Sequence, residues 1–467
     1  MIIRRPRRPE LRLGYEMNAH PAATLGQLRS ALDSITIPVS RRLAPEGPFG
    51  IVPHIGEGLS RDLARPAARA ELREELLGAG LFPFSVNAFP LRDFHARRVK
   101  EQVYLPSWAH HRRVDVTKRI GDQLAELLPE GEAGTISTLG GAYRPTGNSP
   151  ARRRKIAENY VRTAAHFAQI ERDRGVLITL AAEPEPDTTF EVAEDVTSLL
   201  EEEILPAAKA ILPAELGIAK KRVEETLFRY FAVNLDVCHA SVMFRDPVEE
   251  WKTLESAGLR IAKLHLTNAL SLPRPGNAPH AVEEILGYHE PRYLHQTVAR
   301  RSDGSLWRGA DLPDLRSGRR EAADWDEVRV HFHVPLSRAR LGALRTTRPE
   351  TAAALHHALR HPDPPHLVIE TYTWPYFAKK ASRAKKSGSL RPTATRASER
   401  QSRDERTKVL IDGIVDEFRW VLGEIEKGSA RPEEKQSRKK QSQKNTSSQK
   451  TNSKKQSQKK KSRRKKS

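Results

Sequence analysis

Short apolar runs typical of buried β-strands alternate with longer helical patterns from residue 13 to residue 372, and this alternation constrains the fold more than any other feature. Strands that are separated by helices are typical of parallel βα units rather than of hairpins. The sequence predicts strands near residues 14–19, 49–52, 84–89, 135–138, 176–183, 233–239, 261–267, 328–334 and 367–372. This is one strand too many for a (β/α)8 TIM barrel. The run 49–52 is the shortest and is followed by Pro53, so we interpret it as an extra strand.

The net charge of +21 is concentrated at the C-terminus, where residues 431–467 hold 16 Lys and Arg against 2 Asp and Glu. Residues 378–430 add a net +5, which leaves only +2 on residues 1–377. The stretch 428–467 is rich in Lys, Ser and Gln and lacks aromatic residues, so we expect it to be disordered. The predicted organisation is a basic N-terminal arm (1–12), a barrel body (13–377), a basic flexible insertion (378–403), a closing helix (404–427) and this tail (428–467).

The composition predicts a cytoplasmic protein. The one cysteine, Cys238, permits no internal disulfide, which fits a reducing compartment. No apolar run reaches the ~20 residues of a membrane helix, and no apolar stretch follows the N-terminal arginines as it would in a signal peptide. Three uses of the basic tail stay open from the sequence: contact with anionic lipid, contact with nucleic acid, and solubility alone.

Ionisable residues follow the ends of successive predicted strands. They are Glu183, Glu185, Asp236, His239, His265, His331, His333 and Glu370. Parallel barrels build their active sites at the carboxyl ends of the strands, so we expect these side chains to meet. Carboxylates together with imidazoles suit Zn²⁺, Mn²⁺, Fe²⁺ or Co²⁺ better than Mg²⁺. A single histidine usually has a structural role, and Asp236 is also well placed to cap a helix. The metal site is therefore predicted from the coincidence of the whole set.

A further group of residues, which includes Glu185, His331 and His333, is predicted to contact substrate at the same barrel mouth. Asn87 and His95 follow an early strand, and so do Asn18 and His20, although such residues often only satisfy turn backbone. His295 lies in a long segment after residue 270 that exceeds a normal βα loop and is a candidate lid. Trp374 follows Glu370 and is a candidate apolar wall, the alternative being ordinary packing.

The strings DVCHA (236–240), KLHLTNAL (263–270) and IETYTW (369–374), together with Glu183, resemble xylose isomerase-like and apurinic endonuclease-like TIM barrels. Further strings, among them NAHP, TLGGAYR, YLHQ and HFHVP, are similar to EboE-type metabolite traffic proteins of that superfamily. The resemblance implies a divalent metal held by Glu183, Asp236, His265 and Glu370, with His239 as an auxiliary ligand. It implies Glu183 and Glu370 as the proton-transferring pair of an isomerase or epimerase.

Three functions remain open from the sequence. The first is proton transfer on a small hydroxylated metabolite or precursor destined for export, in which the metal holds two adjacent oxygens. The second is metal-dependent phosphoester hydrolysis of the apurinic endonuclease type, although the body lacks a strongly basic footprint. The third is a non-catalytic binding protein that works with other proteins of an export assembly.

Overall fold

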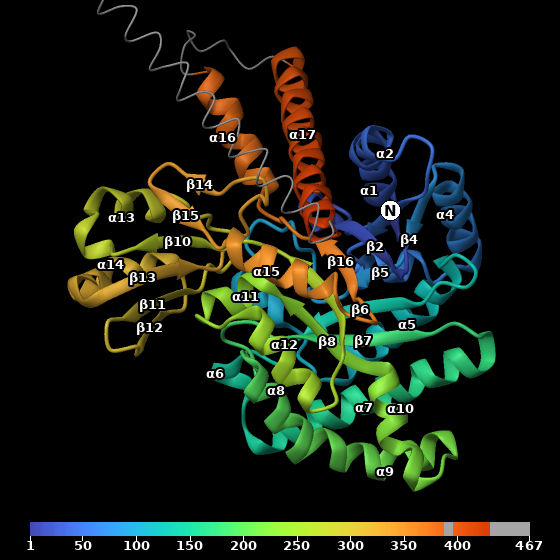
Figure 1. The fold of residues 1–467 in the computed structure, drawn as a ribbon. Coiled ribbons are helices and arrows are strands. Elements are labelled where there is room, and N and C mark those ends of the chain that lie inside the picture. The colour runs from blue at the N-terminus through green and yellow to red at the C-terminus, as the bar shows by residue number, and fades with distance from the viewer. Residues whose placement is uncertain (387–395, 430–467) are drawn as a thin grey trace, which may run out of the picture. The chain divides into compact units, whose positions relative to one another are not determined.

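Parallel strands form a closed barrel in the computed structural model, which describes residues 1–386 and 396–429 (Figure 1). Around the sheet the strand order is β4-β3-β2-β16-β9-β8-β7-β6-β5. Only Phe84 separates β4 from β5 in the chain, so these two form one segment that pairs with β3 on one side and β6 on the other. Counted in this way the ring has eight strands, and the predicted (β/α)8 barrel is confirmed. The strands are β2 (Arg8–Glu16), β3 (Phe49–Val52), β4 (Leu81–Pro83), β5 (Ser85–Asn87), β6 (Gly134–Leu139), β7 (Ile178–Glu183), β8 (Phe231–Asp236), β9 (Ile261–Leu266) and β16 (His366–Ile369).

Helices follow the strands on the outside of the ring (Figure 1). They are α1 (Leu25–Ala31), α2 (Ile37–Leu43), α3 (Glu57–Asp62), α4 (Pro66–Gly78), α5 (His111–Leu127), α6 (Arg144–Gly147), α7 (Pro150–Arg174), α8 (Ala193–Leu199), α9 (Leu205–Leu216), α10 (Val223–Tyr230), α11 (Val237–Val242), α12 (Pro247–Ser256) and α15 (Arg348–Ala358). The longest, α7, shows the local rules clearly. The Ser149 side chain accepts a hydrogen bond from the Arg152 amide, Pro150 occupies the first turn, and Gly175 ends the helix at φ 69°.

One strand assignment from the sequence is wrong. Residues 49–52, interpreted as an extra strand, form β3 inside the barrel, where they pair with β2 and β4. The strand outside the barrel is β13 (Trp325–Val330), which corresponds to the predicted run 328–334. A strand that is short and followed by proline can still belong to a parallel ring. All four residues of β3 are buried between its two neighbours.

The long segment between β9 and α15 folds into a second, antiparallel sheet that we call the insertion (residues 267–347). Its strand order is β12-β11-β13-β10-β15-β14. The strands are β10 (Leu270–Pro273), β11 (Thr297–Arg301), β12 (Leu306–Gly309), β13, β14 (Arg340–Leu341) and β15 (Leu344–Thr346), with helices α13 (Pro279–Leu286) and α14 (Leu315–Gly318). Leu272, Ile285 and Val328 belong to an apolar core of its own. The insertion is therefore a folded unit with its own apolar core rather than a simple loop.

The ends of the chain differ from the predicted organisation. The arm 1–12 is not separate, because β1 (Ile2–Arg5) pairs antiparallel with β2. Within the predicted insertion 378–403, residues 378–386 continue α16 (Trp374–Lys386) and residues 396–403 begin α17 (Arg396–Ser429). Residues 387–395 and the tail from residue 430 onward lie outside the described residues. The chain divides into two compact units, Met1–Val421 and Leu422–Ser467, and the described part of the second is the last two turns of α17. Across the described residues, every helix is too short or too polar to cross a bilayer.

Helix α17 contacts the loop after β16 through a buried glutamate. The Glu417 carboxylate accepts hydrogen bonds from the Leu336 amide, the Thr371 hydroxyl and the Trp374 indole, at 3.0, 2.6 and 2.6 Å. Burial raises the pKa of Glu417 from 4.5 to about 7, although these three donors oppose the rise. Glu417 lies within the predicted closing helix (404–427), next to the buried side chains of Val415 and Phe418.

We expect this buried carboxyl to make stability pH-dependent. Because the pKa is higher in the folded than in the unfolded chain, its contribution is full below about pH 4.5 and is lost as the pH rises through 7, a change of about 3 kcal/mol. Denaturant unfolding of the wild type and of Glu417→Gln between pH 4.5 and 8 measures it. The variant should show a smaller fall in unfolding free energy over this range, whatever its absolute stability. Parallel pH curves for the two proteins would disprove the assignment.

Candidate metal centre

Four ionisable side chains from four strands meet at the carboxyl end of the barrel. Glu183 and Asp236 are the last residues of β7 and β8, His265 is next to last in β9, and Glu370 directly follows β16. A register shift between β8 and β9 places Asp236 opposite His265. Without this bulge Asp236 would face Leu264, whose side chain points to the other surface of the sheet.

The imidazole of His265 lies at the centre of the three carboxylates. Its Nδ1 atom is 3.2 Å from Glu183 Oε1, 3.3 Å from Asp236 Oδ2 and 3.0 Å from Glu370 Oε2. One ligand atom from each of the four residues lies within 4.8 Å of every other. Atoms bound at about 2.1 Å to one cation are spaced roughly 3 Å apart, so these separations fit a shared ion. We name these four residues the four-ligand group.

The charges of the four-ligand group shift the pKa of its members in opposite directions. Burial alone lowers the pKa of His265, but the Glu370 and Glu183 carboxylates raise it well above its usual value. Burial alone raises the pKa of Glu370, but His265 lowers it to about 2. Burial likewise opposes ionisation of Asp236, yet His239 and His333 lower its pKa well below the usual range. Asp236 and Glu370 therefore keep their negative charge and attract a cation.

Unsatisfied acceptors support the fit of a metal ion. Asp236 Oδ2 and Glu370 Oε2 are buried and, apart from their approach to His265 Nδ1, have no hydrogen-bond donor among the residues that the structure describes. Buried polar atoms without partners are rare in native proteins and point to a missing ion or water. Two carboxylate oxygens and one imidazole nitrogen, each with a lone pair to offer, match the ligand preferences of Zn²⁺, Mn²⁺, Fe²⁺ and Co²⁺.

Glu16, at the end of β2, holds the opposite edge of the His265 ring. The Glu16 Oε2 atom is 3.1 Å from His265 Nε2 and 3.5 Å from the fully buried Nζ of Lys263, which also donates to Ser137 Oγ at 2.9 Å. With the hydrogen on Nε2 shared with Glu16, the Nδ1 lone pair faces the carboxylates, the arrangement of a carboxylate–histidine–metal triad. The sequence prediction missed Glu16 because the first strand was placed over residues 14–19, which left Glu16 in mid-strand.

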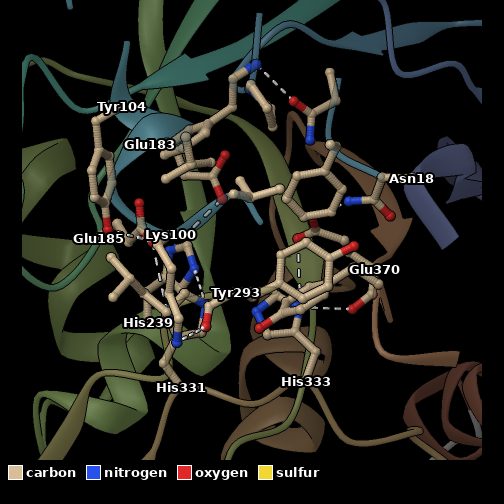
Figure 2. Close-up of a pocket in the computed structure, with 18 residues that line it drawn as sticks. Asn18, Lys100, Tyr104, Glu183, Glu185, His239, Tyr293, His331, His333 and Glu370 are labelled. Carbon is tan, nitrogen blue, oxygen red and sulfur yellow. Dashed lines mark hydrogen bonds and ion pairs between the residues drawn. The ribbon is translucent and has the colours of Figure 1, made fainter. Parts of the chain in front are cut away.

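A second cluster, the histidine group, lies beside the first and consists of Glu185, His239, His331 and His333 (Figure 2). His239 Nε2 is 3.1 Å from His331 Nε2, and His239 Nδ1 is 2.9 Å from the Pro184 carbonyl. His239 Nδ1 is 3.7 Å from Glu183 Oε1, and His239 forms a further set of possible metal ligands with Asp236 and His333, so its predicted role as an auxiliary ligand stays a prediction. Burial raises the pKa of Glu185 to about 8, so this carboxyl holds a proton at neutral pH.

A narrow pocket opens on both groups (Figure 2). Glu183, at the end of β7, and Glu370, directly after β16, line it, and so do all four residues of the histidine group. Aromatic and apolar side chains form most of the remaining wall, among them Phe94, Tyr104, Tyr293 and Tyr372. The Lys100 ammonium, which also lines the pocket, donates to the Tyr293 carbonyl at 2.7 Å and pairs with Asp311, and so ties the loop after β5 to the insertion.

The remaining predicted contacts are divided between the pocket and its surroundings. Asn87 lines the pocket, as does Asn18, whose amide donates to Glu370 Oε1 at 2.7 Å. His95 lies behind Asn18 and is 2.8 Å from its carbonyl. His295 lies behind His331, with Nδ1 3.1 Å from the His331 carbonyl, and Trp374 packs against Glu417 and Gly413. His95, His295 and Trp374 do not line this pocket, and their contact with substrate stays a prediction.

Comparison with known proteins gives distant structural likenesses. No family model and no curated protein matches the chain. Solved structures that it resembles include an L-ribulose 3-epimerase (11% identity, TM-score 0.41, 90% of this chain and 99% of the other). Others are a xylose isomerase domain protein from Planctomyces limnophilus (13%, 0.42, 81% and 96%) and a family 2 AP endonuclease from Brucella melitensis (15%, 0.29, 55% and 78%). At such identities and TM-scores these likenesses establish no family or activity, and the EboE-type resemblance stays a prediction.

The Glu16 contact predicts a measurable effect on metal affinity. Replacing Glu16 with Gln removes the charge that orients His265, and we expect metal binding about 10- to 100-fold weaker. Competition with a chromophoric chelator measures this affinity. The matched control is Glu10→Gln on the same strand, whose side chain is 39% exposed and distant from the ring, and it should bind as the wild type does. Equal affinity in Glu16→Gln and the wild type would rule out the orienting role.

Proposed function

We propose that this chain is a metal-dependent enzyme that transfers a proton on a small hydroxylated metabolite, in the manner of a sugar isomerase or epimerase. The observation that carries the proposal is the placement of Glu183 and Glu370. Both belong to the four-ligand group, both line the pocket, and they approach it from different strands. A proton can therefore be taken on one side of a bound substrate and returned on the other.

The residues around the pocket have different roles in this proposal. Glu183, Asp236, His265 and Glu370 would hold a divalent cation, which when bound supplies Lewis-acid polarisation of substrate oxygens. Asn18 fixes Glu370 Oε1 by its amide hydrogen bond and so orients the carboxylate that moves the proton. Glu185 is protonated at neutral pH and reaches the pocket, where it can donate a hydrogen bond to a substrate oxygen. The aromatic wall excludes water from the transferred proton.

The small size of the pocket and the EboE-type motifs support a metabolite as the substrate. The volume of the pocket is about 70 Å³, which suits a small molecule rather than a polymer. We include in this proposal a role in passing such a metabolite toward export, together with other proteins of an export assembly. Binding of the metabolite without catalysis is a further form of the proposal. Native mass spectrometry of the purified chain, followed by turnover assays on each molecule found, separates an enzyme from a carrier.

Metal content is the first test. Protein purified without chelator or histidine tag should contain about one equivalent of a transition metal. Removing the metal with a chelator should lower the midpoint of thermal unfolding, because three buried carboxylates then repel one another without a counter-ion, and metal that binds only the folded state stabilises it. Metal-free protein that neither binds added Zn²⁺ or Mn²⁺ nor shifts its unfolding midpoint would refute the proposed centre.

Catalysis by the two glutamates is the second test. We expect Glu183→Gln and Glu370→Gln each to reduce turnover by about 10²- to 10⁴-fold, since each removes a proton-transferring carboxylate. Circular dichroism establishes that the fold is retained. The control is Glu249→Gln, an exposed glutamate of α12, which should leave turnover unchanged. Full activity in both active-site variants would exclude the proton-transfer mechanism.

The histidine group favours one alternative, metal-dependent hydrolysis of a phosphoester. Glu185, His239 and His331 offer ligand atoms close enough together for a further ion, and paired metals suit in-line displacement at phosphorus. Against nucleic acid as the substrate stands the net charge of +2 on residues 1–377. Cleavage of an abasic duplex by the metal-loaded protein would establish this alternative, and no cleavage at any metal loading would dismiss it.

A further inference from the structure

A second cleft lies on the other side of the pocket wall, between the insertion and the start of α16. Its volume is about 470 Å³. The insertion contributes Arg292 and His295 to it, and α16 contributes Lys379 and Lys380. Tyr293 and Tyr372 line both this cleft and the metal pocket, and their ring centroids are 5.0 Å apart. We name it the outer cleft.

The outer cleft has an excess of positive charge. Arg292, Lys379 and Lys380 line it against one acidic side chain, Glu290, which accepts a hydrogen bond from the Arg292 amide at 2.9 Å. Neither lysine forms an ion pair with any described residue; the Lys380 ammonium instead lies 4.7 Å from the centroid of the Tyr288 ring. Cationic side chains that line one cleft without carboxylate partners attract an anion.

Two buried polar atoms of the outer cleft lack partners. Arg292 Nε is shielded from solvent and donates to no described residue, so it is available to an acceptor in the cleft. His295 is fully buried, and its Nε2 atom is likewise without a partner among the described residues. Because its Nδ1 atom donates to the His331 carbonyl, which can only accept, the neutral ring presents Nε2 as an acceptor. The cleft therefore offers cationic donors beside one acceptor.

We propose that the outer cleft binds a small hydroxylated anion. A carboxylate or a phosphate group would pair with Arg292, Lys379 and Lys380, and a hydroxyl of the same molecule would donate to His295 Nε2. Arginine supports such recognition because its guanidinium presents several donors in one plane. The proposal goes beyond the metal chemistry and does not depend on it, since none of the cleft residues belongs to the four-ligand group.

Calorimetric titration of the full chain, in buffer containing a chelator, tests the proposal. The probes are glycerate and glycerol 3-phosphate, which carry both an anionic group and hydroxyls. The controls are propionate, which lacks hydroxyls, and glycerol, which lacks an anionic group. We expect saturable binding of glycerate or glycerol 3-phosphate and at least tenfold weaker binding of propionate and glycerol. The stronger of the first two identifies the anionic group. Equal affinities for glycerate and propionate would overturn the role of His295, and binding of neither anion would overturn the site.

Paired variants locate the binding. The double variant Lys379→Ala, Lys380→Ala should bind the better of the two anions at least tenfold more weakly. The double variant Lys220→Ala, Lys221→Ala, which removes an exposed adjacent pair far away in the chain, should bind it as the wild type does. Equal weakening by both pairs would show only diffuse attraction to a basic chain and would contradict the proposal. Glu370→Gln should bind the anion as the wild type does. A loss there would assign the anion to the metal pocket instead, and this result is independent of whether the protein catalyses proton transfer.

Discussion

Three almost fully buried carboxylates surround one imidazole, and the rest of the site depends on this concentration of charge. Glu183, Asp236 and Glu370 are 3%, 1% and 7% exposed. Two like charges at 4 Å repel by roughly 4 kcal/mol even at an effective dielectric constant of 20. A barrel that keeps such a group needs positive charge at its centre. A protonated His265, whose pKa is raised, would supply it, and so would a divalent cation bound in place of that proton.

Charges of alternating sign continue from this centre into the barrel. Lys263 lies two residues before His265 on β9 and points to the same face, because side chains in a strand alternate. Glu16 lies between the two and contacts both. Each buried charge therefore has a neighbour of opposite sign, which is how an ionic network survives away from water. The arrangement fixes the orientation of His265 before any ion arrives, and this is the kind of preorganisation that binding sites require.

Much of the site could be predicted from the sequence, since parallel strands end at one edge of a barrel and ionisable residues end four of them. Glu183, Asp236, His265 and Glu370 are among the eight residues that this pattern gives, and the family resemblance singled them out. The pairing register was not predictable: the bulge that places Asp236 opposite His265 depends on neighbouring strands and leaves no motif. Local pattern also failed for Phe49–Val52, whose burial comes from its partners. Glu417 was hidden for the same reason, because its three donors come from distant segments.

The insertion has a consequence for how this protein could diversify. The candidate metal ligands come from the barrel strands and the residue that follows β16, whereas His331, His333 and Tyr293 come from the insertion, which has a separate apolar core. Sequence drift in that module can reshape the pocket mouth while the cation-binding carboxylates stay in place. Relatives with the same reactive centre and unlike insertions would then be selective for different molecules, and exchanging residues 267–347 between them would transplant selectivity without rebuilding the chemistry.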